Sequence, residues 1–191
     1  MSKEKTCRLL TGSAIAAAAV GFSVITAFPA SAEQGTANGI DVTISPQDPT
    51  TIRPGATPMR FTVTLANTTT TDNPEVGLVV SLGHCSCNPS PVKMMPAGSM
   101  HMLDPGTNTW QTVPYVAEGG GTDFLTRTLV APFALEHGQT TTYQLDVQLD
   151  TNQALSISSG NSSIDVTITD PATNTAIGHT PTASLPITVE P

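Results

Sequence analysis

The segment His84-Cys85-Ser86-Cys87 has the residue types and spacing that could most readily do chemistry. Two cysteines one residue apart can form a disulfide only if the chain turns between them. In an extended strand their Cα atoms would lie about 6.6 Å apart, at the upper limit for a bridge. Residues 88–91, Asn-Pro-Ser-Pro, follow directly and favour a turn. The spacing therefore predicts a Cys85–Cys87 disulfide that makes the loop locally rigid.

The same cysteines have a second interpretation, in which they hold a soft metal ion. Thioether, thiolate and imidazole groups together select Cu(I) over hard cations, and the segment 94–102 adds more of these donors. Strand alternation in that segment would instead place its last two methionines in the core and the intervening histidine toward solvent. The disulfide, a copper site and free or intermolecular thiols all stay open at this point. The candidate copper ligands are His84, Cys85, Cys87, Met100, His101 and Met102, in a stretch that also holds Met94 and Met95.

Catalytic patterns are absent from the sequence where they would be expected. The chain has no G-x-S-x-G, H-E-x-x-H or G-x-x-x-x-G-K motif. His137 and His179 lie among turn residues and are interpreted as solvated, while Asp146 and Asp150 are interpreted as keeping the outer face of a strand soluble. Asn67-Thr-Thr69 and Asn161-Ser-Ser163 match the glycosylation acceptor pattern and are interpreted as turns. We expect no enzyme activity and no cofactor, apart from copper in the second interpretation.

The amino terminus has the three parts of a secretory signal peptide. Lys3, Lys5 and Arg8 form a basic region, an apolar run extends over residues 9–27, and Ala30-Ser31-Ala32 matches a cleavage site. Residues 1–32 are therefore predicted to be the signal peptide and residues 33–191 the mature domain. We expect the mature chain to be secreted into an oxidising compartment, which favours the disulfide.

Charge and hydropathy restrict the classes of partner. The chain has a formal net charge of −8, and the signal peptide contains three of its seven basic residues. A negative field repels phosphate backbones and anionic lipid headgroups, so nucleic acid and a bare membrane surface are excluded as expected partners. After Glu33 no apolar run approaches the roughly 18–20 residues of a membrane span. The expected partner is a protein or another cell-envelope component.

Short runs with alternating apolar residues, separated by turn residues, predict an all-β chain. A more continuous apolar run over residues 76–82 predicts a central strand covered on both faces, and residues 103–110 predict a hairpin with Trp110 packed at its base. Seven to nine strands at this spacing favour a single immunoglobulin-like antiparallel β-sandwich over residues 33–191, with an antiparallel barrel as the alternative. The alternating runs are Ile40–Ile44, Phe61–Leu65, Tyr143–Leu149, Ile164–Ile168 and Leu185–Val189.

The order of these features resembles that of secreted bacterial Ig-like β-sandwich proteins of uncharacterised function. The resemblance lies in Phe61-Thr-Val-Thr-Leu-Ala-Asn67, the apolar strand running into Gly83–Cys87, the Asp-Pro hairpin that ends at Trp110, and the Gly119–Gly121 loop. It implies fold and location and brings over no site residue. The Met and His residues are also loosely similar to those of periplasmic copper chaperones, although the spacing of that motif is not reproduced. The loops around 83–102 and 117–123 are the expected recognition surface, because irregular loops on a rigid sandwich commonly carry binding.

Overall fold

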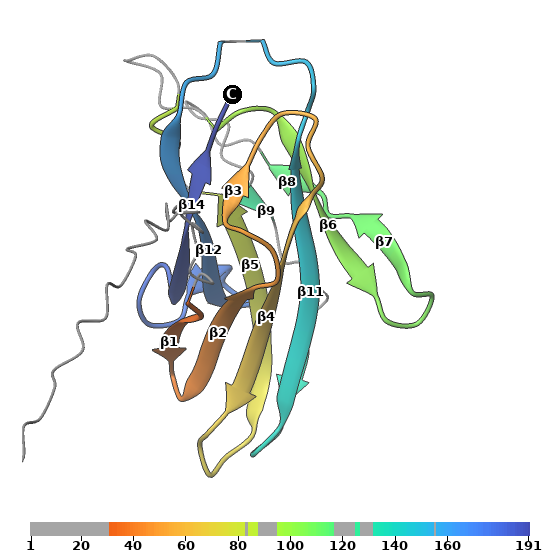
Figure 1. Cartoon of the computed structure of the whole chain (residues 1–191). Coiled ribbons are helices and arrows are strands. Elements are labelled where there is room, and N and C mark those ends of the chain that lie inside the picture. Colours follow the sequence, from red (N-terminus) through yellow and green to blue (C-terminus); the bar gives the residue numbers. More distant parts are fainter. Residues whose placement is uncertain (1–30, 83, 88–94, 117–124, 127–131, 155) are drawn as a thin grey trace, which may run out of the picture.

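The chain folds into two β-sheets packed face to face (Figure 1). The computed structural model describes residues 31–82, 84–87, 95–116, 125–126, 132–154 and 156–191. Residues 1–30 of the predicted signal peptide, Met94 and the whole of the predicted recognition loop 117–123, with Gly119–Gly121, lie outside the described residues. The all-β prediction is confirmed for the part of the chain that is described.

The first sheet has six strands and contains most of the residues that concern the site. Its order is β1 (Glu33–Ala37), β2 (Ile40–Pro46), β4 (Met59–Asn67), β11 (Thr140–Leu149), β6 (Gly98–Asp104) and β7 (Thr109–Thr112). All of its neighbouring strands are antiparallel.

The second sheet also has six strands. Its path is β10 (Phe133–Leu135), β5 (Asn73–Leu82), β12 (Gly160–Asp170), β14 (Ala183–Val189) and β3 (Thr51–Ile52), with β13 (Thr175–Ala176) paired to β12. The β14–β3 pair is parallel. A separate two-stranded sheet is formed by β8 (Tyr115–Val116) and β9 (Leu125–Thr126).

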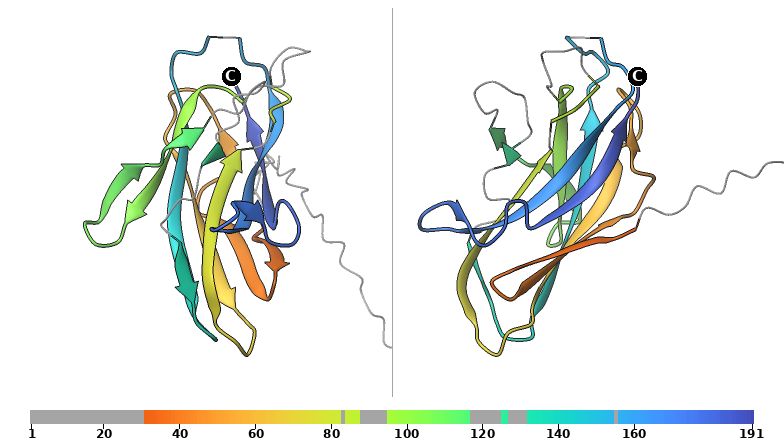
Figure 2. Two further views of the ribbon diagram at one scale, coloured as in Figure 1. Left: turned by 180° about the vertical axis from the view of Figure 1, so that it is seen from behind. Right: turned by 90° about the vertical axis from the view of Figure 1, so that its left-hand side faces the viewer.

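The order of the long strands is that of an immunoglobulin-like sandwich. In the constant-type Ig fold, strands A-B-E-D form one sheet and C-F-G the other. Here β2-β4-β11-β6 and β5-β12-β14 occupy those places in the same chain order. Figure 2 shows the two layers from behind and from the side. The chain is thus a β-sandwich, and the alternative of a closed barrel is wrong, because both sheets have open edges.

The strand count is larger than the seven to nine predicted, since each sheet holds six strands. The long strands do correspond to the predicted runs, and the predicted central strand is confirmed in β5, which lies between β10 and β12. The additional strands are short: β3 and β13 have two residues each, and β10 has three. Such short segments carry no measurable alternation, so sequence periodicity cannot reveal them.

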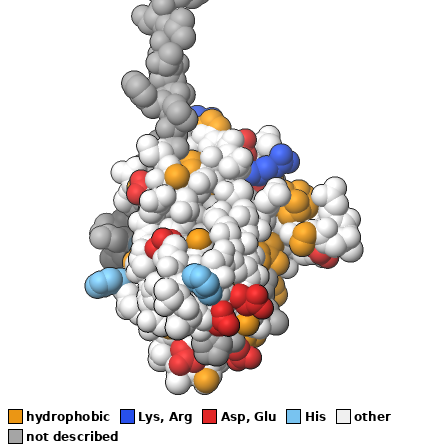
Figure 3. Space-filling view, turned by 90° about the horizontal axis from the view of Figure 1, so that it is seen from below, with side chains coloured by type: hydrophobic (Ala, Val, Ile, Leu, Met, Phe, Trp, Pro, Cys, Tyr) orange, Lys and Arg blue, Asp and Glu red, His pale blue; other side chains and the backbone are white. Residues whose placement is uncertain are grey.

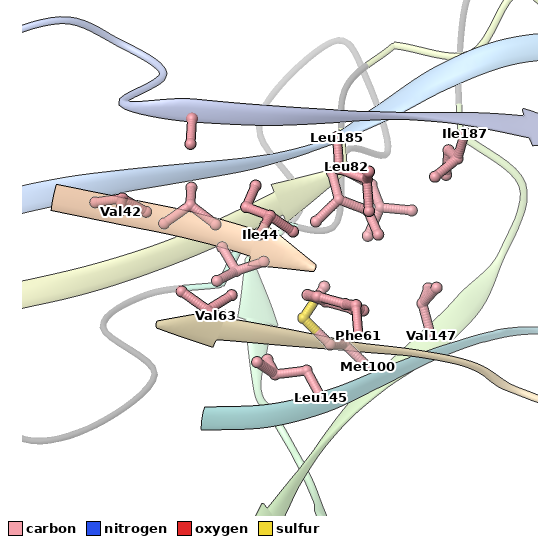
Figure 4. Close-up of a cluster of buried hydrophobic side chains, with 14 of the residues drawn as sticks. Val42, Ile44, Phe61, Val63, Leu82, Met100, Leu145, Val147, Leu185 and Ile187 are labelled. Atoms are coloured by element: carbon pink, nitrogen blue, oxygen red, sulfur yellow. The ribbon is translucent and has the colours of Figure 1, made fainter. Parts of the chain in front are cut away.

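One hydrophobic core fills the space between the sheets (Figure 4). Side chains from β2, β4, β6 and β11 face those from β5, β12 and β14, as the period-two alternation requires. Phe61 and Met100 are fully buried among them. Burying a side chain of this size contributes about 1.5 to 3 kcal/mol relative to exposure, so the core fixes the register of every long strand.

The end of β4 is held by a buried amide. The Asn67 side chain is 1% exposed, and its Nδ2 donates to the carbonyl oxygens of Thr71 and Leu135, both at 2.9 Å. Its Oδ1 accepts from the Thr69 N–H at 3.0 Å and the Thr69 hydroxyl at 2.7 Å. Because both ends of the amide are satisfied, Asn67 joins the β4–β5 turn to β10 across the gap between the sheets.

Candidate functional site

Cys85 and Cys87 are the predicted site residues that the structure brings together. Their sulfur atoms lie 2.07 Å apart, at disulfide distance, and their Cα atoms are 5.2 Å apart. Both side chains are fully buried, and the Cys87 N–H points to Cys85 Sγ at 3.2 Å. The chain turns at Ser86, as the spacing of the cysteines requires.

This turn is fastened to the start of β12. The Ser86 N–H donates to the Asn161 carbonyl at 3.0 Å, and the Asn161 N–H donates to Ser86 Oγ at 2.8 Å. Gly160 has no room for a side chain, since a Cβ there would lie 2.4 Å from the Cys87 nitrogen. The disulfide therefore belongs to a packed junction between the turn and the second sheet.

The other candidate copper ligands are not gathered around the cysteines. Met100 is part of the core, beside Phe61 in Figure 4, and Met102 packs against the core, whereas His101 lies on the opposite face of β6. Met95 is buried and accepts a hydrogen bond from the Ser162 hydroxyl at 3.6 Å. In the described residues, no group of three or more His, Cys, Asp and Glu side chains could hold a metal ion. His84 is exposed.

A histidine–aspartate pair occupies the outer face of the first sheet. His101 Nδ1 and Asp146 Oδ1 lie 2.7 Å apart, on neighbouring strands where the two residues are direct partners. Their side chains are 22% and 7% exposed, respectively. A carboxylate only accepts hydrogen bonds, so Nδ1 of the imidazole carries the proton in this bond.

The burial of Asp146 corrects the prediction that this residue keeps an exposed face soluble. The alternation was right, because the flanking Leu145 and Val147 point into the core. Asp146 is nevertheless 5% exposed. Its direct partner Arg60 lies on the same face, with its guanidinium 5.8 Å from the centroid of the Trp110 ring. Arg60 is on β4 and Trp110 on β7, so the two side chains reach toward each other across the strands that carry Asp146 and His101. Asp150 is exposed, as predicted.

Trp110 stands on a hairpin that projects from the sandwich (Figure 1). The predicted hairpin is confirmed, with Leu103 opposite Trp110 and Asp104 opposite Thr109. Trp110 does not pack at its base as expected, however: it is 36% exposed and is the one large hydrophobic side chain exposed in the described residues. In the view of Figure 3 the hairpin forms the lobe on the right, with hydrophobic side chains at its junction with the body.

The tip of the hairpin is held in a defined turn. Asp104 Oδ1 accepts from the Gly106 N–H at 2.8 Å, and Oδ2 accepts from the Thr107 hydroxyl at 3.0 Å. The Gly106 N–H, followed by the Thr107 hydroxyl, lowers the pKa of Asp104 below its ordinary value of 3.8. Asn108 adopts a φ of 53° and donates its N–H to the Asp104 carbonyl at 2.8 Å. These bonds present the Trp110 strand as a pre-formed element.

In the described residues the outer face of the first sheet carries a His–Asp pair beside an exposed tryptophan. A His–Asp pair supplies a base and its orienting group, but hydrolysis by a triad also requires a nucleophile hydrogen-bonded to the imidazole. Within the described segments the His101 imidazole bonds to Asp146 alone. His137 and His179 are exposed and lie in turns, as predicted. No helix in the described part of the chain has the length and apolarity needed to cross a bilayer.

Sequence reasoning missed the group formed by Arg60, Trp110, His101 and Asp146. Arg60 and Asp146 are 86 positions apart in the chain, and only the pairing of β4 with β11 and of β11 with β6 places Arg60, Asp146 and His101 in one row. No local motif encodes such a row. The available signal is weak: alternation puts Arg60, His101 and Asp146 on outward positions of their strands, while Trp110 is predicted to pack at the base of its hairpin.

No protein-family model matches this chain, and a search of curated proteins finds no significant match. Among solved structures, the chain is similar to AvmM, which catalyses macrocyclization in alchivemycin A biosynthesis. The identity is 12%, the match covers 78% of this chain and 89% of AvmM, and the TM-score is 0.48.

Two further solved structures are similar to this chain. The CARDB domain of a Pyrococcus furiosus protein, solved in complex with di-metal ions, is 10% identical, with coverage of 81% and 91% and a TM-score of 0.39. The ASH/PapD-like domain of human CEP192 is 12% identical, with coverage of 80% and 83% and a TM-score of 0.26. At these TM-scores none of the three bears on function, and the β-sandwich assignment rests on the strand pairings of this chain itself.

Proposed function

We propose that this chain is a secreted, non-enzymatic Ig-like domain that contacts an extracellular or cell-envelope protein through its β6–β7 hairpin. The observation that carries the proposal is the exposed Trp110, held by Arg60 on a hairpin that projects from the sandwich. We define the contact surface as the outer side chains of this hairpin, Leu103, Trp110 and Thr112, together with Arg60.

The composition of this surface favours a protein partner. Tryptophan and arginine are the side chains that most often dominate the binding energy of protein interfaces. A tryptophan buried in a partner's pocket contributes a large apolar area while ordering few rotatable bonds. The Asp104 turn and the Arg60 contact hold Trp110 before binding, which reduces the entropy lost on association.

Charge supports the same class of partner. The chain has a net charge of −8, and acidic side chains are scattered over the face seen in Figure 3, where basic ones lie toward the upper part. The hairpin strand β7 itself has no charged residue. An uncharged strand with an aromatic side chain on an acidic protein favours a protein contact over nucleic acid or anionic lipid.

The direct test is site-specific photo-crosslinking in the culture of the producing cells. A benzophenone amino acid at position 110 should form a covalent adduct with one predominant envelope or secreted protein. The control places the same group at Thr142, which is exposed on the outer face of β11, and it should give no such adduct. Once the crosslinked partner is identified, it can be captured on the purified wild-type protein or on the Trp110→Ala variant. The variant should recover at least about tenfold less partner, since a tryptophan buried in an interface commonly contributes about 2 kcal/mol or more.

Secretion is tested in the same cultures. We expect the protein in the extracellular fraction, with an amino terminus at Glu33. Equal adducts from positions 110 and 142, or a chain that stays unprocessed in the cytosol, would contradict the proposal.

A further inference from the structure

Strand β7 is an edge strand: the backbone N–H and C=O groups on one side of it form hydrogen bonds to β6, and those on the other side have no neighbouring strand among the described residues. The Val113 N–H donates to the Met100 carbonyl at 2.9 Å, and in the same register Met102 pairs with Gln111 and His101 with Thr112. Bonded pairs alternate along an antiparallel ladder, so Gln111 directs its backbone groups toward β6. Trp110 and Thr112 consequently direct their N–H and C=O groups away from the sheet. Among the described strands, β7 pairs with β6 alone.

The four residues of this edge include no charge and no proline that would protect it against strand addition. Natural edge strands are commonly shielded by charged residues or proline, or by being very short. The sequence Thr-Trp-Gln-Thr of β7 has neither charge nor proline, and all four residues are exposed. The edge strand at the other side of the same sheet begins with Glu33, and in the second sheet β10 is followed by Glu136 while β3 is followed by the Arg53–Glu190 ion pair.

The charge distribution indicates what could occupy this edge. Two copies of a chain with net charge −8 repel each other wherever acidic side chains meet. At β7 two copies could approach without placing like charges opposite each other, because the strand is neutral. The strand is also self-complementary in register, since a two-fold axis through Gln111 pairs open backbone groups with open backbone groups.

We propose that β7 pairs antiparallel with β7 of a second copy, so that the first sheets of the two copies become one continuous sheet. In this register Gln111 faces Gln111 of the second copy, and Trp110 lies opposite Thr112 of the second copy. Both Trp110–Thr112 pairs then exchange N–H···O=C bonds. The proposal rests on the proposed function, since it uses the same hairpin and names the partner as another copy of this chain.

The pairing brings the two indole rings together on the outer face. Trp110 of each copy becomes a diagonal neighbour of the other, at about 7–8 Å between Cα atoms, within reach of aromatic side chains. Arg60 holds each ring over its own sheet. Because Trp110 is the single tryptophan of the chain, any exciton coupling between indoles in the far-ultraviolet circular dichroism spectrum must come from two copies.

The test combines sedimentation velocity with circular dichroism over about a hundredfold range of protein concentration. We expect a monomer–dimer equilibrium, with an indole exciton couplet that grows with the dimer fraction. Thr112→Pro removes an open-edge N–H without removing a bond to β6, and it should weaken dimerisation by at least about tenfold. The control Thr142→Val lies outside the contact surface, on the outer face of β11, and should dimerise as the wild type does.

A second edge variant keeps the test decisive if proline distorts the hairpin. Thr112→Lys places a charge beside Trp110 of the second copy and should also abolish the couplet, while cooperative thermal unfolding shows that the fold is intact. A chain that remains monomeric throughout, or a dimer that Thr112→Pro and Thr112→Lys leave unchanged, would overturn the self-pairing. If position 110 still crosslinks to a different protein in that case, the proposed function stands and only the identity of the partner is wrong.

Discussion

The His101–Asp146 pair gives a quantitative test of the site. The perturbation is a double-mutant cycle with His101→Val, Asp146→Val and the double variant, valine being chosen because both positions lie in strands. The cycle measures the coupling free energy of the two side chains, separate from the cost of each single substitution.

The expected coupling follows from the geometry of the pair. A hydrogen bond to a charged group contributes about 1.5–3 kcal/mol, whereas a solvent-exposed ion pair contributes about 0–1 kcal/mol. The Nδ1–Oδ1 distance is 2.7 Å, and the side chains are 22% and 7% exposed, so the pair lies nearer the first class than the second. We expect a coupling of about 1.5 kcal/mol, or roughly a tenfold change in the unfolding equilibrium constant.

Urea unfolding of the four proteins at neutral pH, followed by Trp110 fluorescence, measures this coupling. Trp110 is the single tryptophan, so the signal has one source. The matched control is the Thr64–Thr142 pair, whose hydroxyl oxygens lie 3.0 Å apart on the same outer face but in solvent. Its coupling should be below about 0.5 kcal/mol.

A His101–Asp146 coupling no larger than that of the threonine pair would refute the reasoning. It would mean that the Arg60–Trp110 contact does not shield the carboxylate from water, and the site would then be an ordinary solvated sheet face.

Three further predictions concern the loop, the core and the partly buried phenol of Tyr143. Replacing Cys85 and Cys87 together with alanine should lower the free energy of unfolding by about 1.6 kcal/mol through loop closure; stoichiometric copper or free thiols in the denatured wild type would contradict the disulfide. Phe61→Ala should cost about 3–5 kcal/mol in urea unfolding, and a cost below about 1 kcal/mol would contradict its place in the core. Burial raises the pKa of Tyr143 above 10.0, so the neutral phenol is favoured in the folded state. The contribution of the Tyr143 phenol to the free energy of unfolding is therefore fully present below about pH 10, and it is lost as the pH rises through the folded-state pKa. Tyr143→Phe should remove this loss above pH 10, and an equal loss in both proteins would contradict it.

The long strands could be predicted because their chemistry is local. Residues 143–149 alternate strictly, and in β11 the apolar members Leu145, Val147 and Leu149 are buried. The turn residues between such runs mark where each strand ends. The presence and position of these strands follow from this periodicity alone.

The candidate site could not be predicted in the same way because it depends on register. The outward direction of Asp146 is a local property, but its neighbours on that face, Arg60 and His101, are set by the pairing of β11 with β4 and β6. A shift of one residue in the β4–β11 pairing would turn Arg60 to the other face of the sheet relative to Asp146. Strand β1 is not predicted for a different reason: burial alternates along it, but its sequence Glu-Gln-Gly-Thr-Ala has Ala37 as its one apolar side chain, so hydropathy shows no alternation.

The amide of Asn67 determines how this protein responds to a glycosylating host. Asn67-Thr-Thr69 matches the acceptor pattern, yet in the folded chain the nitrogen that would receive the sugar donates both of its hydrogens to carbonyl oxygens and has almost no contact with solvent. Attachment at this position must precede folding, and the attached glycan then keeps β4 and β10 from meeting. Material made in a eukaryotic secretory pathway should therefore divide into a native form without sugar at Asn67 and a glycosylated form that never reaches the native state, while the exposed Asn161 accepts a glycan without this conflict.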